Sequence, residues 1–265
     1  MDGVLLKLSP STALDFKSCA QLFKFRTVDR LPEPVTRGAA RGSLVHAVLE
    51  RLFLEPPMSR TPEHAEDLLA SLWEEVRSEP DVRPVDLGSA DESGWLEDAR
   101  RMLRNYFRLE DPRALQAARL EWWVEYELPD IHLRGVIDRL EEHTDGSWVL
   151  TDYKTGRVPG EARELAAFFG LRFYALMCWK AFGVIPREIR LVYLADPAVL
   201  TLNPNENMLL AFERQIQALA RAINRALDTG DWRPRPSPFC MSCSYHALCP
   251  AWHNDGGGEP SARSA

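Results

Sequence analysis

The sequence predicts an α/β fold in which a central mixed β-sheet is flanked by helices. Residues 119–155 contain short runs in which apolar and polar side chains alternate, as they do in strands that bury one face. Longer segments on both sides carry apolar residues at helical spacing. Strands flanked by such helices favour α/β packing, and 265 residues with 45% hydrophobic content suffice for one large core.

Three neighbouring strands are expected to form an antiparallel meander. Trp122–Leu128 and His132–Glu141 alternate with a period of two residues. Trp148–Lys154 follows the dipeptide Asp145-Gly146, which is a strong signal for a hairpin turn. A further strand is expected at Glu188–Leu194.

Several helices are expected around these strands. The clearest begins near Arg37, because Leu44, Val48 and Leu52 recur at helical spacing before Pro56 ends the pattern. Two amphipathic helices then form an insert over about 58–112, which we interpret as a lid or arm. The expected helices are 11–18 with Ser11 as N-cap, about 37–53, about 62–78, about 92–109, 161–182 and about 205–228.

The charge balance excludes a generally basic surface. The net charge is -7 with a pI near 5.5, so a polyanion would have to be met by a local basic patch or by a metal ion. The best candidate for a phosphate-contacting surface is the basic stretch of Lys24, Arg26, Arg30, Arg37 and Arg41.

Nothing in the sequence predicts export or a membrane partner. The first residues lack the cationic and apolar regions of a secretory signal. The most apolar stretch, Leu165–Trp179, contains Arg172 and is shorter than the roughly 20 residues of a bilayer span. We therefore expect a cytoplasmic protein.

A carboxylate and a lysine share one face of the strand Val149–Lys154. Alternation places Asp152 and Lys154 on one side and Tyr153 on the other. Pairing through the hairpin can bring Asp138 beside Asp152, which creates a site for Mg²⁺ with the backbone carbonyl of Tyr153 as a further ligand. His46 could add a ligand that suits Mn²⁺.

An alternative interpretation needs no metal. Asp152 and Lys154 can form an exposed ion pair, and Asp138 can pair with a neighbouring arginine, as is routine on antiparallel sheets. A histidine such as His46 on an apolar helix is more often a core residue than a ligand. Spacing alone favours this alternative.

Three motifs together resemble the RecB-like exonuclease family of the PD-(D/E)XK nuclease superfamily. Gly135-Val136-Ile137-Asp138 and Asp152-Tyr153-Lys154-Thr155-Gly156 are similar to its second and third motifs. Gly42-Ser43-Leu44-Val45-His46 is similar to the first, in which a helix delivers a histidine to the metal. The resemblance implies a restriction-endonuclease-like core with His46, Asp138, Asp152 and Tyr153 as metal ligands and Lys154 as a catalytic residue.

A fourth motif of the family is only partly present. The family carries a glutamine and, four residues later, a tyrosine; Tyr174 matches the tyrosine, but Gly170 stands in the glutamine position. Glycine lacks the amide with which the family glutamine would contact the substrate or the catalytic lysine. Arg172 can supply this polar contact only if its side chain faces the cleft. Glu125 resembles an acidic position that some relatives have near the metal.

The cysteines suggest a second inorganic site. Cys240, Cys243 and Cys249 have ligand-like spacing, and thiolates select zinc or iron-sulfur clusters. Zinc could take a fourth ligand from His246 or His253. The chain also resembles the subfamily of AddB and the CRISPR adaptation nucleases, which implies instead a 4Fe-4S cluster that adds Cys19 and closes the C-terminal loop onto the N-terminus.

The resemblance implies a Mg²⁺- or Mn²⁺-dependent DNA exonuclease acting on single-stranded or end-containing DNA in repair, with a possible helicase partner. Alternatives are a CRISPR adaptation nuclease and a non-catalytic DNA-binding or helicase-partner module of the same fold. We expect one nuclease domain over 1–252, with a cysteine staple of Cys19 and 234–252 and a disordered tail over 253–265. Cys178, inside an apolar helix, receives no function.

Overall fold

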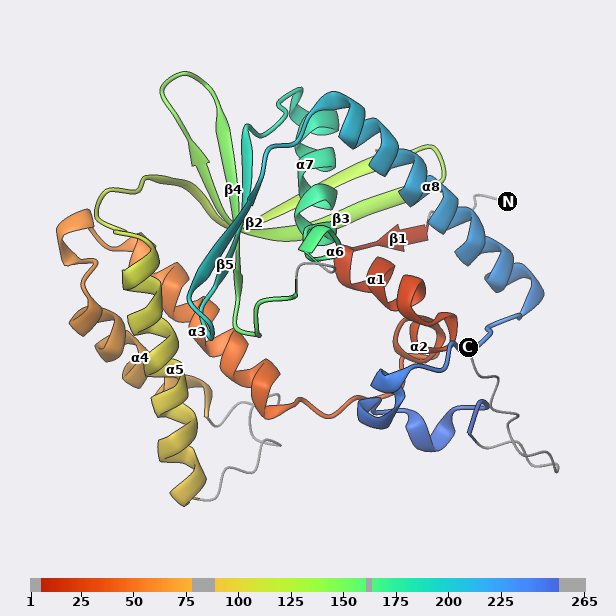
Figure 1. Ribbon diagram of the computed structural model, residues 1–265, viewed down its shortest axis with the longest axis horizontal. Coiled ribbons are helices and arrows are strands. Elements are labelled where there is room, and N and C mark those ends of the chain that lie inside the picture. The colour runs from red at the N-terminus through yellow and green to blue at the C-terminus, as the bar shows by residue number, and fades with distance from the viewer. Residues whose placement is uncertain (1–5, 78–88, 161–163, 253–265) are drawn as a thin grey trace. The chain divides into compact units, whose positions relative to one another are not determined.

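The computed structural model of the protein describes residues 6–77, 89–160 and 164–252 (Figure 1). The chain forms two compact units. The sheet unit comprises Met1–Pro10 and Val35–Gln217, and the cysteine unit comprises Ser11–Pro34 and Ala218–Ala265. The expected tail over 253–265 lies outside the described residues, and the assignment of 1–252 to a single domain stays a prediction.

A six-stranded mixed sheet forms the centre of the sheet unit, which confirms the predicted fold class. β3 pairs with three other strands: it runs antiparallel to β2 and β4 and parallel to β1. β5 pairs in parallel with β4 and antiparallel with β6. The strands are β1 (Leu6–Leu8), β2 (Ala117–Leu128), β3 (Ile131–Glu142), β4 (Trp148–Lys154), β5 (Glu188–Tyr193) and β6 (Ala198–Leu202).

The antiparallel meander is present as predicted, but β1 and β6 were not expected. Both are short edge strands of three and five residues, so alternation could not mark them. β1 forms only because Leu6, Lys7 and Leu8 meet the start of β3, more than 120 residues later in the chain. Such long-range pairing leaves no local signal.

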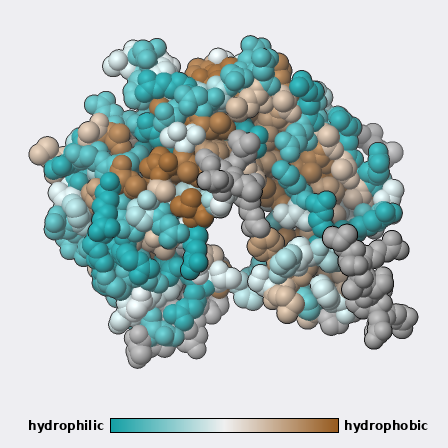
Figure 2. Space-filling view, in the orientation of Figure 1, coloured by the Kyte–Doolittle hydropathy of each residue, from teal (hydrophilic) through white to brown (hydrophobic). Residues whose placement is uncertain are grey.

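The helical insert is part of the core and not a lid. α3 (Arg37–Leu54), α4 (Pro62–Val76) and α5 (Ser89–Leu109) bury their apolar faces in one cluster with Tyr153, Val192 and Leu194 of the sheet region. Their outer surface is mostly hydrophilic in Figure 2. Trp95, Met102 and Tyr106 of α5 are buried in this same cluster, which corrects the interpretation as a lid.

The helix expected over 161–182 is interrupted. α6 (Glu164–Ala167) ends before Phe168, whose ψ of 3° departs from the helical value, and α7 (Phe169–Phe182) begins after it. Phe168 and Phe169 are both buried at this break. α7 ends at Gly183, whose φ of +74° terminates a helix without strain.

The cysteine unit joins a segment from each end of the chain. α1 (Pro10–Ser18) begins one residue before the expected cap Ser11, because proline is favoured in the first helical turn. α2 (Ala20–Phe23) and the π-helical turn η1 (Lys24–Val28) follow. Phe23 stacks on Trp232 with 6.1 Å between ring centres, and the Tyr245 hydroxyl donates to the carbonyl of Leu31 over 3.1 Å.

Further helical elements of the described residues are α8 and several short turns. α8 (Glu206–Thr229) matches the helix expected over about 205–228, and the boundary between the two units falls within it. Among these turns are η2 (Pro57–Ser59), η4 (Pro238–Ser242) and η5 (His246–Leu248). Among the described residues, no helix has the length and apolarity that a membrane crossing requires.

Candidate functional site

Two adjacent strands bring the predicted carboxylates together. The register of β3 and β4 pairs Arg139 with Thr151, so Asp138 and Asp152 are the next residues along the two strands. The Asp138 Oδ2 accepts a hydrogen bond of 2.7 Å from the backbone N–H of Tyr153, and the Lys154 ammonium contacts the Asp152 carboxylate. The strand alternation therefore places these side chains as the sequence predicted.

His46 reaches the same place from α3. Its Nε2 lies 3.1 Å from the carbonyl oxygen of Tyr153, and its Nδ1 lies 3.5 Å from Asp138 Oδ2. Burial is the main cause that lowers the pKa of His46, which favours the neutral imidazole that a metal requires. Helix α3 thus adds a nitrogen donor beside two oxygen donors.

Glu121 of β2 completes the group and was not predicted. One donor atom each from His46, Glu121 and Asp138 lie within 4.8 Å of one another. Glu121 lies between the paired residues Leu120 and Trp122 and has a φ of +40°. A left-handed conformation costs a residue with a Cβ about 1–2 kcal/mol, and such strain is concentrated at functional sites.

The register could have identified Glu121 once the β2–β3 hairpin was assigned. Leu120 pairs with Arg139 and Trp122 with Ile137, so Glu121 is opposite Asp138. Glu125, the acidic residue considered from the sequence, is exposed and lies 3.2 Å from His132 instead. It is outside the carboxylate group.

The site concentrates negative charge in a partly buried place. Burial, and next the charge of Asp152, raise the pKa of Asp138 well above its usual value. Burial, followed by Glu50 and Asp152, raises the pKa of Glu121. Burial opposes the ammonium of Lys154, but the charge and hydrogen bond of Asp152, together with the smaller effects of Asp138 and Tyr193, raise the lysine pKa overall. Carboxylates held this close favour a bound cation.

Two glycines let helices approach the site closely. A Cβ at Gly42 of α3 would lie 2.9 Å from the Oγ1 of Thr155, just after β4. A Cβ at Gly135 of β3 would lie 2.5 Å from Cε1 of Tyr174, on α7. Burial is the main cause that raises the pKa of Tyr174, followed by the charges of Asp152 and Asp138.

Arg172 does not replace the missing glutamine. Its guanidinium carbon lies 5.1 Å from the ring centre of Phe212 on α8, and burial lowers its pKa. It is therefore directed to α8 and not into the cleft. At Gly170 an added Cβ would meet Pro10 at 3.7 Å, an ordinary contact, so the helix does not require glycine there.

The carboxylate group opens into a pocket of about 470 Å³. The pocket is lined by one face of α3 and by Glu121; the α3 residues are Gly42, Ser43, His46, Ala47 and Glu50. A space of this size beside the donor atoms is large enough to admit a phosphate group and a water molecule.

Four of the five positive charges of the predicted basic stretch are paired with acids, so its role as a phosphate surface stays a prediction. Lys24 pairs with Asp29 at 2.5 Å, and Arg26 pairs with Asp15 and Glu33 at 2.7 and 2.6 Å. Arg37 and Arg41 are paired with Asp91 and Asp98 on α5 at 3.1 and 2.7 Å. The sequence shows the positive charges, but only the structure shows which acidic side chains pair with them.

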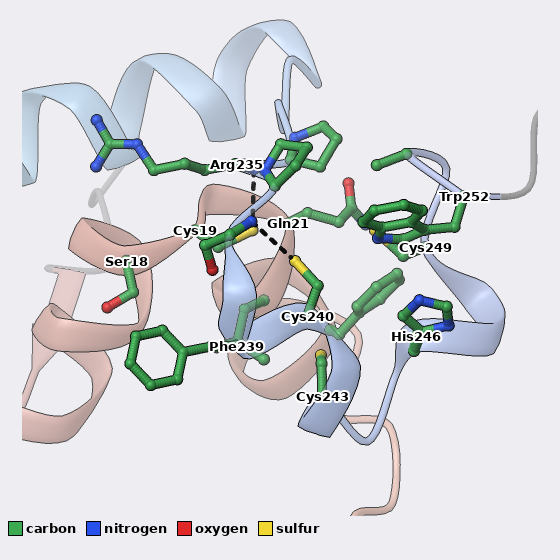
Figure 3. Close-up of a pocket in the computed structure, with 16 residues that line it drawn as sticks. Ser18, Cys19, Gln21, Arg235, Phe239, Cys240, Cys243, His246, Cys249 and Trp252 are labelled. Atoms are coloured by element: carbon green, nitrogen blue, oxygen red, sulfur yellow. Dashed lines mark hydrogen bonds between the residues drawn. The ribbon is translucent and has the colours of Figure 1, made fainter. Parts of the chain in front are cut away.

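All four predicted cysteine ligands line one pocket of about 350 Å³ in the cysteine unit (Figure 3). The backbone N–H of Arg235 donates to Cys19 Sγ over 3.4 Å, and that of Ser237 donates to Cys240 Sγ over 3.3 Å. Burial, with a smaller contribution from the other three thiols, raises the pKa of Cys249. Four sulfurs with peptide donors fit a thiolate-ligated metal centre.

The other possible ligands of this centre have different surroundings. His246 lines the pocket, and its ring stacks on Trp252 with 5.3 Å between centres. His253 lies outside the described residues. Cys178 is fully buried in α7, and burial raises its pKa to about 12, as expected for a thiol that serves only packing.

Three comparisons with known proteins show what the chain is similar to. A solved structure named "Putative exonuclease", from Eubacterium rectale, is similar with a TM-score of 0.55 and 12% identity, over 97% of this chain and 91% of that one. The protein named SSO0001 has a TM-score of 0.38 and 17% identity, over 70% of this chain and 81% of that one. A search of curated proteins gave no match. The family model described as the PD-(D/E)XK nuclease superfamily matches residues 7–250, and the chain therefore belongs to this superfamily.

Proposed function

We propose that the protein is a RecB-like, Mg²⁺- or Mn²⁺-dependent DNA exonuclease. The observation that carries the proposal is the convergence of His46, Glu121 and Asp138 within 4.8 Å, beside Asp152 and the carbonyl of Tyr153. A nitrogen donor among oxygen donors suits Mn²⁺, and the carboxylates alone suit Mg²⁺. Glu121 joins the ligands expected from the sequence.

Each side chain has a separate task in the hydrolysis of a phosphodiester bond. A divalent ion held here would lower the pKa of its bound water and stabilise charge on the phosphate oxygens. Lys154 stays protonated because Asp152 raises its pKa, so it can neutralise charge that develops on the scissile phosphate. Tyr174 positions the donor set by its contact with β3 at Gly135.

The substrate is proposed to be DNA that is single-stranded or has ends, in repair or recombination, with a helicase as a possible partner. The superfamily supports a nucleic-acid substrate, and the open pocket beside Glu121 is compatible with a strand terminus. Presence of all three of Asp138, Asp152 and Lys154 argues against a non-catalytic module. A CRISPR adaptation nuclease would use the same chemistry.

The cysteine pocket is proposed to hold a 4Fe-4S cluster. Cys19, Cys240, Cys243 and Cys249 supply four sulfurs, and N–H groups directed at Cys19 and Cys240 stabilise thiolates. Such a cluster would join the two chain segments of the cysteine unit in a structural role. Zinc is the less favoured occupant. Brown protein whose colour is lost in Cys19→Ser supports the cluster, whereas colourless protein with stoichiometric zinc contradicts it.

The nuclease proposal is tested by digestion of end-labelled single- and double-stranded DNA and of closed circular DNA with Mg²⁺ or Mn²⁺. Asp152→Ala and Lys154→Ala should abolish cleavage, and wild type should spare the closed circles. Glu125→Ala is the matched control, because Glu125 is an exposed carboxylate on the same sheet. Equal cleavage by wild type and Asp152→Ala would refute the proposal.

A further inference from the structure

A fully buried arginine lies directly beneath the candidate site. Arg139 follows Asp138 on β3, and its side chain is 0% exposed. Its Nη1 and Nη2 donate to the two carboxylate oxygens of Glu110 over 2.9 and 2.8 Å. Further donations reach Glu141 over 2.9 Å and the hydroxyl of Tyr153 over 2.5 Å. The guanidinium is thus held on several sides.

Tyr153 connects this arginine to the donor atoms of the site. On one face of β4 its hydroxyl accepts from Arg139. Its backbone N–H donates to Asp138 Oδ2 over 2.7 Å, and its carbonyl oxygen lies 3.1 Å from His46 Nε2. A displacement of the Tyr153 ring would therefore move two peptide groups that orient proposed metal ligands.

The other end of the network is fixed by the helical insert. Glu110 is the residue after α5, and its N–H donates to the carbonyl of Tyr106 over 3.0 Å. Asn105 of the same helix donates to the carbonyl of Leu194 over 2.8 Å. The rings of Tyr106 and Tyr153 meet edge to face with 5.8 Å between centres. The end of α5 is thus attached to the sheet beneath the site.

We propose that Glu110, Arg139 and the Tyr153 hydroxyl are positioning residues for the metal ligands, and that α5 is the support through which they act. The inference rests on the proposed nuclease function. A buried ion pair gains little net stability over apolar packing of the same volume, because both charges lose their hydration. What this network provides is a fixed geometry of β3 and β4 at Asp138 and Tyr153.

Two variants act at the two ends of the network. Tyr153→Phe removes one oxygen and keeps the ring, whereas Glu110→Gln removes the charge and keeps the shape. Mn²⁺ binding is measured by calorimetry without DNA, and kcat and KM are measured on single-stranded DNA. We expect Mn²⁺ affinity and kcat to fall at least about tenfold in each variant. KM for DNA should change by less than about twofold, because these residues do not reach the pocket.

Arg60→Lys is the control for a purely structural role. Arg60 is a second buried arginine near the same helices, and its donors bind the backbone carbonyls of Phe53, Glu55, Pro112 and Leu115. The Arg60→Lys variant should have a lower unfolding temperature than wild type and an unchanged affinity for Mn²⁺.

The inference is overturned by wild-type Mn²⁺ affinity in both network variants, or by an equal loss of affinity in Arg60→Lys. It also fails if Tyr153→Phe does not fold, because the hydroxyl would then serve the fold and not the site. The outcome is separate from that of the proposed function. Cleavage by Asp152→Ala would refute the nuclease assignment, while the Mn²⁺ isotherms would still decide whether the network positions a cation site.

Discussion

The contact between Gly135 and Tyr174 gives a sharp test of how the site is assembled. A Cβ at Gly135 would lie 2.5 Å from Tyr174 Cε1, whereas ordinary contacts begin at 3.4 Å. Gly135→Ala therefore requires the Tyr174 ring to retreat by about 0.9 Å. Overpacking of this kind costs about 1–3 kcal/mol. At about 2–4 °C per kcal/mol for a chain of this size, the unfolding temperature should fall by roughly 2–12 °C.

The same displacement should lower activity. Tyr174 packs against Gly135 on β3, the strand that carries Asp138, and a misplacement of about 1 Å near a reacting centre can reduce the rate on the order of a hundredfold. Differential scanning calorimetry and single-turnover cleavage of labelled DNA measure the two effects. Replacing the ring in the double variant Gly135→Ala/Tyr174→Leu should recover most of the lost stability, because the clash is removed.

Gly94→Ala is the matched control. Gly94 lies exposed within α5, and a Cβ there meets nothing within 4 Å. Alanine is favoured over glycine inside a helix, so this variant should gain about 0.5–1 kcal/mol and keep wild-type activity. Glycine to alanine is therefore expected to lower the stability at position 135 and to raise it at position 94. If Gly135→Ala is as stable as wild type, the reasoning about close approach is wrong.

The remaining predictions concern charge and sulfur. Burial, and next Asp152, raise the pKa of Asp138, so metal-free protein should lose stability as the pH rises from the ordinary carboxyl range through the raised pKa. Asp138→Asn, neutral throughout, should flatten this dependence in thermal unfolding with EDTA, and a parallel decline in both proteins would contradict the assignment. Glu121→Gln should weaken Mn²⁺ binding by about tenfold or more while leaving the fold intact, as judged by calorimetry and circular dichroism; unchanged affinity would exclude Glu121 as a ligand. Cys178→Ala should cost about 1 kcal/mol by leaving a small cavity and should retain the colour of the proposed cluster, in contrast to Cys19→Ser; loss of colour would show that the cysteine ligands are misassigned.

The sequence by itself determined the local part of the site. In Trp148–Lys154 the two-residue period of a strand decides that Asp152 and Lys154 share a face, whatever the rest of the chain does. The Asp145-Gly146 turn then brings Asp138 next to Asp152. Helix α3 could be read in the same way, because its apolar face repeats at helical spacing.

Only the tertiary structure decided which distant residues complete the site. Glu121 joins His46 and Asp138 through the β2–β3 register and a left-handed backbone that its neighbours must enforce. Arg139 forms an ion pair with Glu110 at the end of the insert. Arg37 and Arg41 form ion pairs with acidic residues of α5. Periodicity reports which face of an element is buried, but the partner on that face depends on packing between segments far apart in the chain. The amino-acid sequence thus showed the strands that carry the site, and the packing of helix on sheet selected the residues that surround it.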